Sequence, residues 1–384
     1  MAPAALSLSS VSFTGSKERA KAFGVYGAVS GGGAAIGIIL GGTLTEYASW
    51  RWCLGVNVPI ALATAAAPVP YVKESKAHGS TKYDVPGAIL VTLGLVSLVY
   101  GFTQAAKLKN PGRSTDVLGW TDSSTLTFLG AGIILLVAFV LWERRTSTPL
   151  LPMNVALDRN RGGSYLVFLF LGAGLFAMFL FLTFYFQITM GYSTLRAGFA
   201  FLPFRLGIIL TAGVVANILP KVGPKPIMVT GLVLAVVGML MLTQIDAGTS
   251  YWTHVLPAEV LMSIGMACVF IPTSSTALIG VSEHDAGVAS ALLNTSQQVG
   301  GSLGTALLNT LYAGAVTSFL AEKLGPNADK AQAAKIASDY LVHGYHVAFF
   351  RGSVLLTVAL LMAGLRINAK KDDIPQEAGV PAAA

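Results

Sequence analysis

The sequence predicts an all-α fold, a bundle of helices that crosses a lipid bilayer many times. Of its 384 residues 54% are hydrophobic and only 11% are charged, whereas soluble domains have about 25% charged residues. The hydrophobic residues gather in runs of about 20, the length at which a helix crosses about 30 Å of hydrocarbon. The same composition excludes a disordered chain, which is rich in charge and poor in apolar residues.

Ten apolar runs are long enough to be complete spans, and short polar connections separate them. Before them, residues 1–13 form an apolar stretch that is too short to cross, which predicts a partial first helix. This stretch lacks the basic leader and the cleavage site of a signal peptide. The ten expected spans are residues 23–44, 51–72, 85–104, 126–142, 165–188, 195–219, 227–245, 255–279, 287–319 and 347–365.

The basic residues predict the orientation of these spans. One set of alternate connections carries nearly twice as many lysines and arginines as the other, and the richer set is expected to face the cytoplasm. This set includes Lys370 and Lys371, so the C-terminus is expected to be cytoplasmic in a multi-pass protein of the plasma membrane. The formal charge of +7 is spread over short loops and not over one face, which argues against nucleic-acid binding.

A faint internal repeat predicts how the spans are grouped. The stretch from Ser16 to Thr43, with Gly33 and Gly37 four residues apart, resembles residues 282–310, which contain Gly300 and Gly304. The repeat predicts a partial N-terminal bundle (1–83), an inter-half helix pair with its loops (84–145), a C-terminal six-helix bundle (146–368) and a disordered cytoplasmic tail (369–384).

Several motifs along the chain carry a resemblance to a known family. They are residues 1–7 and 33–42, Ser49-Trp-Arg-Trp52 with Asn57-Val-Pro59, and residues 195–203, 220–224 and 293–301. Together they resemble the major facilitator superfamily, specifically its fourteen-span drug/proton antiporter branch. The resemblance implies export of small amphipathic or cationic compounds in exchange for protons, by alternating access around a midplane cavity. The implied partners are a small-molecule substrate, protons and the bilayer, and no cofactor is implied.

The chain departs from this branch in two ways. The antiporter motif of the family reads GxxxGPxxGG, and here the proline position is Ile38, so the kink that a proline imposes is in doubt. The chain is also expected to begin within the fourth span and to lack the first three. A miscalled start, a pseudogene fragment and a deliberate truncation are the alternatives, and a transport-inactive fragment is a rival function.

Four glycines of residues 33–42 are predicted to form a helix-packing motif. They are Gly33, Gly37, Gly41 and Gly42. No strand precedes them and the GxGxxG spacing is not met, which argues against a phosphate-binding loop. Small residues four apart let two membrane helices approach closely. The pattern leaves open whether this contact moves during transport or is static.

Arg205 and Glu259 are charged residues within expected spans, where a lone charge costs at least about 2.5 kcal/mol. We therefore expect each to have a partner or to face water, and we expect them to approach each other. The functional hypothesis is that Glu259 exchanges protons or meets a cationic substrate while Arg205 biases its protonation. A structural ion pair, or a glutamate that reaches the outer interface, is the alternative.

A polar stripe runs along the ninth expected span. Asn294, Gln298 and Asn309 recur on one helical face together with Gly301 and Thr305. The stripe predicts either a wall of the substrate pathway or interhelical hydrogen bonds worth about 0.6 kcal/mol each.

The sequence offers no catalytic residue and no metal site. Cys53 and Cys268 stand alone in apolar runs, and the five histidines are expected in or beside loops without other ligands at metal-binding spacing. HExxH, nucleophile-elbow and P-loop motifs are absent from the sequence. A membrane-embedded enzyme or sensor is therefore the less favoured alternative to a transporter.

Overall fold

The computed structural model of the protein describes residues 33, 36–37, 39–67, 84–109, 117–281, 286–324 and 336–373. Within these residues, eight helices are long and apolar enough to cross a membrane, which confirms eight of the ten expected spans. Their bounds are Val85–Ala105, Ser123–Glu143, Arg159–Thr189, Thr194–Val222, Pro224–Gln244, Tyr251–Ala277, Gly287–Leu324 and Ala337–Arg366.

These spans are built from labelled helices and short turns. The helices are α5 (Val85–Ala105), α6 (Ser123–Glu143), α7 (Met153–Ala156), α8 (Arg159–Phe184), α9 (Thr194–Ala200), α10 (Leu202–Val222), α11 (Pro224–Met241), α12 (Leu256–Ala277), α13 (Ala286–Leu324) and α15 (Ala337–Arg366). Two π-helical turns, Tyr185–Thr189 and Tyr251–Val255, continue α8 and precede α12.

The first two expected spans are described in part. Residues 39–47 are helical, and α3 (Trp50–Gly55) and α4 (Asn57–Ala66) follow with an interruption at Val56. The Cys53 thiol donates to the Gly41 carbonyl at 3.4 Å and so joins α3 to the preceding helical residues. Residues 1–13, where the partial first helix is expected, and residues 68–83 lie outside the described residues.

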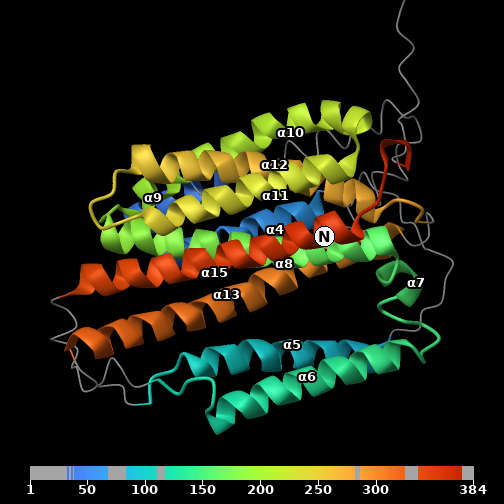
Figure 1. Cartoon of the computed structure of the whole chain (residues 1–384), viewed down its shortest axis with the longest axis horizontal. Coiled ribbons are helices and arrows are strands. Elements are labelled where there is room, and N and C mark those ends of the chain that lie inside the picture. Colours follow the sequence, from blue (N-terminus) through green and yellow to red (C-terminus); the bar gives the residue numbers. More distant parts are fainter. Residues whose placement is uncertain are drawn as a thin grey trace, which may run out of the picture.

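The helices after α7 pack around α8. α8 lies against α13 and α15, while α12 lies against α10 and α11 (Figure 1). Aromatic side chains fill the centre, where the rings of Tyr185 and Tyr345 meet edge to face at 6.0 Å and Phe181 lies 6.3 Å from Phe349. A continuous buried core therefore connects the α8–α15 bundle, whereas its status as a separate domain stays a prediction.

Alternate connections lie at opposite ends of this bundle. At one end Arg159 donates to the carbonyls of Leu365 and Arg366 at 3.0 and 3.1 Å. At the other end the Tyr185 hydroxyl donates to the Asp246 carbonyl at 2.8 Å. The connections before α8 and after α15 therefore share one end, and which end faces the cytoplasm stays a prediction.

The closest helix contacts use the glycines of the second repeat. A Cβ at Gly300 would overlap the Leu169 carbonyl of α8, and one at Gly304 would overlap Ala173. Across the same contact, a Cβ at Gly172 would overlap the Gln297 carbonyl. Because no side chain separates them, the backbones of α8 and α13 touch, as the small-residue spacing allows.

Replacing Gly300 by alanine is expected to destabilise the protein by about 1–3 kcal/mol. The added methyl group must displace the α8 backbone, and this overpacking outweighs the gain in helix propensity of about 1 kcal/mol. Gly314→Ala is the matched control, because no described atom lies within 4 Å of a Cβ at that position of the same helix. Thermal unfolding in detergent measures both variants, and equal melting temperatures would contradict the close contact.

The hairpin of α5 and α6 stands apart from the bundle, beyond α13 (Figure 1). Its two helices interlock, since Leu136 packs on Gly94 and Leu129 on Gly101. Thr310 of α13 donates to the Phe102 carbonyl of α5 at 2.7 Å and ties the hairpin to the bundle at one end.

The two ends of the hairpin meet at a buried carboxyl pair, Asp84 and Glu143. Asp84 Oδ1 accepts from Gly87 N at 3.0 Å and from Trp142 Nε1 at 2.8 Å. Although burial raises the pKa of Asp84, its hydrogen bonds from Gly87, Trp142 and Glu143 together lower that pKa below its ordinary value. Asp84, at the start of α5, therefore connects this end of α5 to the end of α6 through Trp142.

The structure corrects the expected C-terminal boundaries. α15 begins at Ala337, ten residues before the expected span, so His343 and His346 lie in a helix and not in a loop. The expected disordered tail is ordered at its start, because Ala369 is buried and Lys371–Asp373 form a turn against Gly223. Residues 374–384 lie outside the described residues.

Candidate functional site

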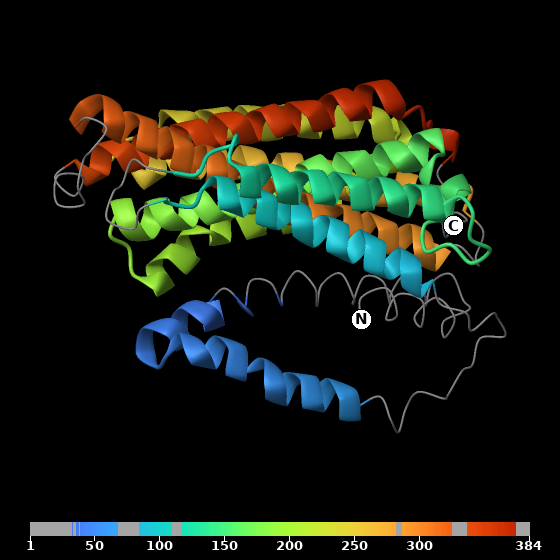
Figure 2. The same ribbon diagram turned by 90° about the horizontal axis from the view of Figure 1, so that it is seen from below.

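A cleft separates the helical residues 39–47 and α3 from the bundle face formed by α8, α9 and α10. Figure 2 shows the segment of residues 39–66 running along this side of the bundle. The cavity has a volume of about 360 Å³. Its lining, which we call the glycine cleft, comprises Gly37, Gly41, Gly42, Thr45, Cys53, Phe179, Thr183, Gln187, Thr194, Ala197, Gly198, Phe201 and Arg205.

Arg205 supplies the charge of this cleft. It lies in the first turn of α10, and its guanidinium carbon stands 4.9 Å from the centre of the Phe179 ring of α8. Arg205 Nε is buried and has no hydrogen-bond partner among the described residues. A cation–π contact is worth about 0.5–2 kcal/mol, which offsets only part of the cost of an intramembrane arginine. The cleft therefore holds a cation that is incompletely satisfied.

Arg205 and Glu259 were expected to approach each other, and this prediction is wrong. No ion pair joins the two side chains among the described residues, although α10 and α12 are in contact. The contact is made by Gly207, where Ser263 Cβ stands 2.8 Å from the position of an added Cβ. Arg205 is two residues earlier, about 200° around the helix, and so points away from α12.

Glu259 is instead enclosed in the bundle. Its side chain is fully buried, and Oε1 has no hydrogen-bond partner among the described residues. Oε2 lies 3.5 Å from the Tyr251 hydroxyl, which donates its single proton to the Ala200 carbonyl at 2.8 Å. Burying an unpaired carboxylate costs several kcal/mol, so Glu259 is an unusual residue for the interior of the bundle.

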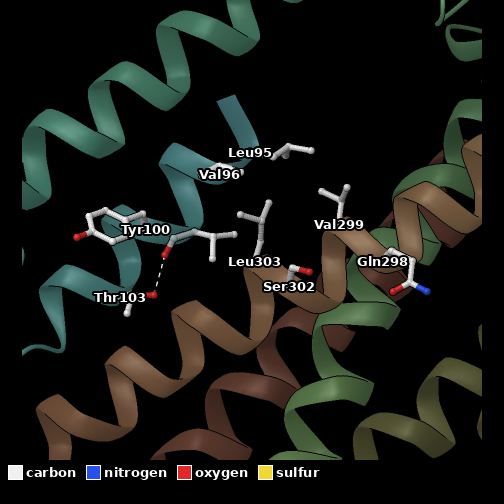
Figure 3. Close-up of a pocket in the computed structure, with 9 residues that line it drawn as sticks. Leu95, Val96, Tyr100, Thr103, Gln298, Val299, Ser302 and Leu303 are labelled. Carbon is white, nitrogen blue, oxygen red and sulfur yellow. Dashed lines mark hydrogen bonds between the residues drawn. The ribbon is translucent and has the colours of Figure 1, made fainter. Parts of the chain in front are cut away.

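The residues of the polar stripe on α13 do not share one environment. Gln298 lines a cavity between α13 and α5, together with Ser302 and Thr103 (Figure 3). Asn294 and Asn309 are exposed, and the Asn294 amide donates to the Ser290 carbonyl of its own helix at 3.0 Å. Gly301 is buried against Phe176 of α8 and does not share the exposed face.

The predicted helix-packing glycines make one close contact with described residues. A Cβ at Gly42 would stand 3.0 Å from Leu195 Cα, whereas no described atom lies within 4 Å of a Cβ at Gly33, Gly37 or Gly41. Glu46, one turn after Gly42, accepts from Leu195 N at 2.9 Å. The glycine segment therefore touches the bundle at the start of α9 and opens into the cleft elsewhere.

Comparison with known proteins places this arrangement in a family. Residues 1–305 match the Major Facilitator Superfamily. The chain belongs to the Major Facilitator Superfamily. Membership decides between the two classes left open by the sequence, because it makes the chain a multi-pass membrane transporter and not an enzyme.

Relatives of this superfamily member are named for antibiotic resistance and export. A puromycin resistance protein of Streptomyces alboniger is 44% identical over 365 residues, which cover 94% of this chain and 69% of the relative. A cephamycin export protein of Amycolatopsis lactamdurans is 34% identical, covering 81% and 63%. A tetracenomycin C resistance and export protein of Streptomyces glaucescens is 31% identical, covering 84% and 58%. The chain thus spans about three fifths to two thirds of these relatives.

The cleft of this superfamily member also contains polar residues that were not predicted to line a pathway. Thr183 lies at the end of α8 and Gln187 in the π-helical turn that continues it, so two polar residues four apart in an apolar stretch were a readable signal. Thr45 and Cys53 gave no such signal, because their side chains meet only through the packing of α3, where Thr45 Oγ1 and Cys53 Sγ stand 3.1 Å apart.

Proposed function

We propose that this chain forms the drug-binding part of a proton-coupled exporter of small amphipathic or cationic compounds. It works by alternating access, follows the fourteen-span plan, and lies in the plasma membrane with its C-terminus in the cytoplasm. The observation that carries the proposal is Arg205, an incompletely satisfied cation in a cleft between two helix groups. Such residues within a membrane mark substrate or ion pathways.

The cleft gives a physical means for a substrate to act on Arg205. An amphipathic cation binds well to an aromatic face, and the face of Phe179 is the surface that the Arg205 guanidinium covers. A cationic substrate therefore competes with Arg205 for Phe179. The displaced guanidinium must find water or an anion, which changes the electrostatic potential felt by ionisable groups of the bundle, Glu259 among them.

Puromycin, an amphipathic base, is the first compound to test, because the relative of highest identity named above is a puromycin resistance protein. The purified full chain in proteoliposomes is expected to accumulate puromycin against its gradient when a pH gradient is imposed. Dissipating the gradient with a protonophore should abolish this accumulation. Correctly inserted protein that moves no puromycin under a pH gradient would contradict the proposal.

A further inference from the structure

A second hollow lies between the α5–α6 hairpin and the bundle, away from the glycine cleft. It consists of two cavities of about 430 and 770 Å³ that share Leu95 of α5 and Val299 of α13. Figure 3 shows the first of them, with Leu95 and Tyr100 on one wall and Val299 and Leu303 on the other. We call the continuous hollow the hairpin groove.

The hairpin groove is closed at one end and charged at the other. The hydrogen bond from Thr310 to the Phe102 carbonyl joins α13 and α5 at the closed end. Between the ends the walls are largely apolar, with Val91 and Phe139 on the hairpin and Leu292 on α13. At the charged end, which we call the open end, the lining includes Arg366, the last residue of α15, and Asp158, beside residues 150–157 of the connection from α6 to α8.

The length of the larger cavity matches one leaflet of a bilayer. Its lining on α13 runs from Val288 to Val299, eleven residues along the helix, which gives a depth of about 16 Å. This depth is about half of the roughly 30 Å of hydrocarbon. An acyl chain that enters beside Arg366 therefore reaches the middle of the membrane where the larger cavity joins the smaller one.

The charges at the open end favour an anion. Asp158 is neutralised locally, since it pairs with Arg161 at 3.7 Å and accepts from the backbone of Asn160 and Arg161. Arg366 is then the cation of the described lining, and Arg159, which donates to the carbonyls of Leu365 and Arg366, adds a positive charge beside it. Basic pockets between membrane helices bind anionic lipid head groups. The same positive charge repels an amphipathic cation, the substrate class proposed for the glycine cleft.

We propose that the hairpin groove is a binding site for one anionic glycerophospholipid, with its head group at Arg366 and one acyl chain between α5 and α13. The bound lipid fills the space that the hairpin leaves against the bundle. This site is separate from the glycine cleft and does not depend on the proposed transport activity.

Native mass spectrometry of the purified full chain tests the site with two probes, phosphatidylglycerol and phosphatidylcholine. We expect one retained phosphatidylglycerol and a preference over phosphatidylcholine. Arg366→Gln should lower this preference about fivefold, the effect of one interfacial cation. Arg145→Gln removes an exposed cation beyond the end of α6, outside the groove lining, and should leave the preference unchanged.

Filling the groove gives an independent test. Val91→Trp and Leu292→Trp, which act from opposite walls, should each abolish the retained lipid. Leu361→Trp, on the exposed face of α15, should not. Equal retention of the two lipids by the unchanged protein, or an equal effect of Arg145→Gln and Arg366→Gln, would overturn the proposal. Displacement of the lipid by ethidium, with ethidium binding lost in Leu292→Trp, would also overturn it and identify the groove as a substrate site.

Discussion

Replacing Arg205 by glutamine is expected to reduce puromycin efflux by at least about tenfold without reducing the amount of protein in the membrane. The variant loses the only charged side chain among the described lining residues of the glycine cleft. It also loses an intramembrane cation whose insertion costs at least about 2.5 kcal/mol, so the thermal stability should stay the same or rise. Loss of transport with retained stability is the opposite of what a packing defect produces.

Arg351→Gln is the matched control for this prediction. Arg351 is an exposed arginine in α15 and is not part of the cleft lining, so the same chemical change there should leave efflux unaltered. Drug accumulation in cells that express each variant, normalised to membrane abundance, measures both effects. Efflux by Arg205→Gln at the level of the unchanged protein would remove Arg205 from the transport pathway.

Replacing Glu259 by glutamine is expected to abolish substrate-driven proton release while the fold is retained. Glutamine has nearly the same shape as glutamic acid, but it cannot exchange a proton. Its contact with Tyr251 is preserved, so we expect little change in unfolding temperature. Release of protons from proteoliposomes on addition of puromycin, followed with a pH-sensitive dye, measures the effect.

Two comparisons make the Glu259 result specific. Glu322→Gln changes an exposed glutamate at the end of α13 and should leave proton release intact. Tyr251→Phe removes the hydroxyl nearest to Glu259 and should shift the pH dependence of transport without abolishing it. Unaltered proton release in Glu259→Gln would assign this residue a purely structural role.

The spans were predictable because lipid imposes a simple length and composition rule. Eight spans from Val85 to Arg366 were predicted to within a few residues at most ends. The main error was the start of α15, where polar residues such as His343 and His346 hid a helix that continues beyond the hydrocarbon. His346 is held there by the Ile245 carbonyl at 2.5 Å, a contact between segments 101 residues apart that sequence periodicity does not reveal.

The sequence identified single residues of the candidate site but not how they are arranged. Their positions within spans predicted that Arg205 and Glu259 each need a partner or water. Arg205 lines the cleft and lies over Phe179, whereas Glu259 is fully buried and its Oε1 has no partner among the described residues. Their separation could not be predicted, because it depends on which face of α10 meets α12, and Gly207 decides that face. Of the four glycines for which close helix packing was predicted, only Gly42 approaches a described atom, and the close contact of α8 with α13 is made by Gly300 and Gly304, which were not predicted to pack.

If the glycine cleft is the route of the substrate, the native Cys53 in its lining must be reachable from water and protected by substrate. In a Cys268→Ala background, a charged, water-soluble maleimide is expected to label Cys53, and puromycin should slow the reaction. Cys268, which packs among α10, α11 and α12, should stay unlabelled in Cys53→Ala. A Cys53 thiol that does not react, or that reacts at the same rate with and without puromycin, would contradict a route through the cleft.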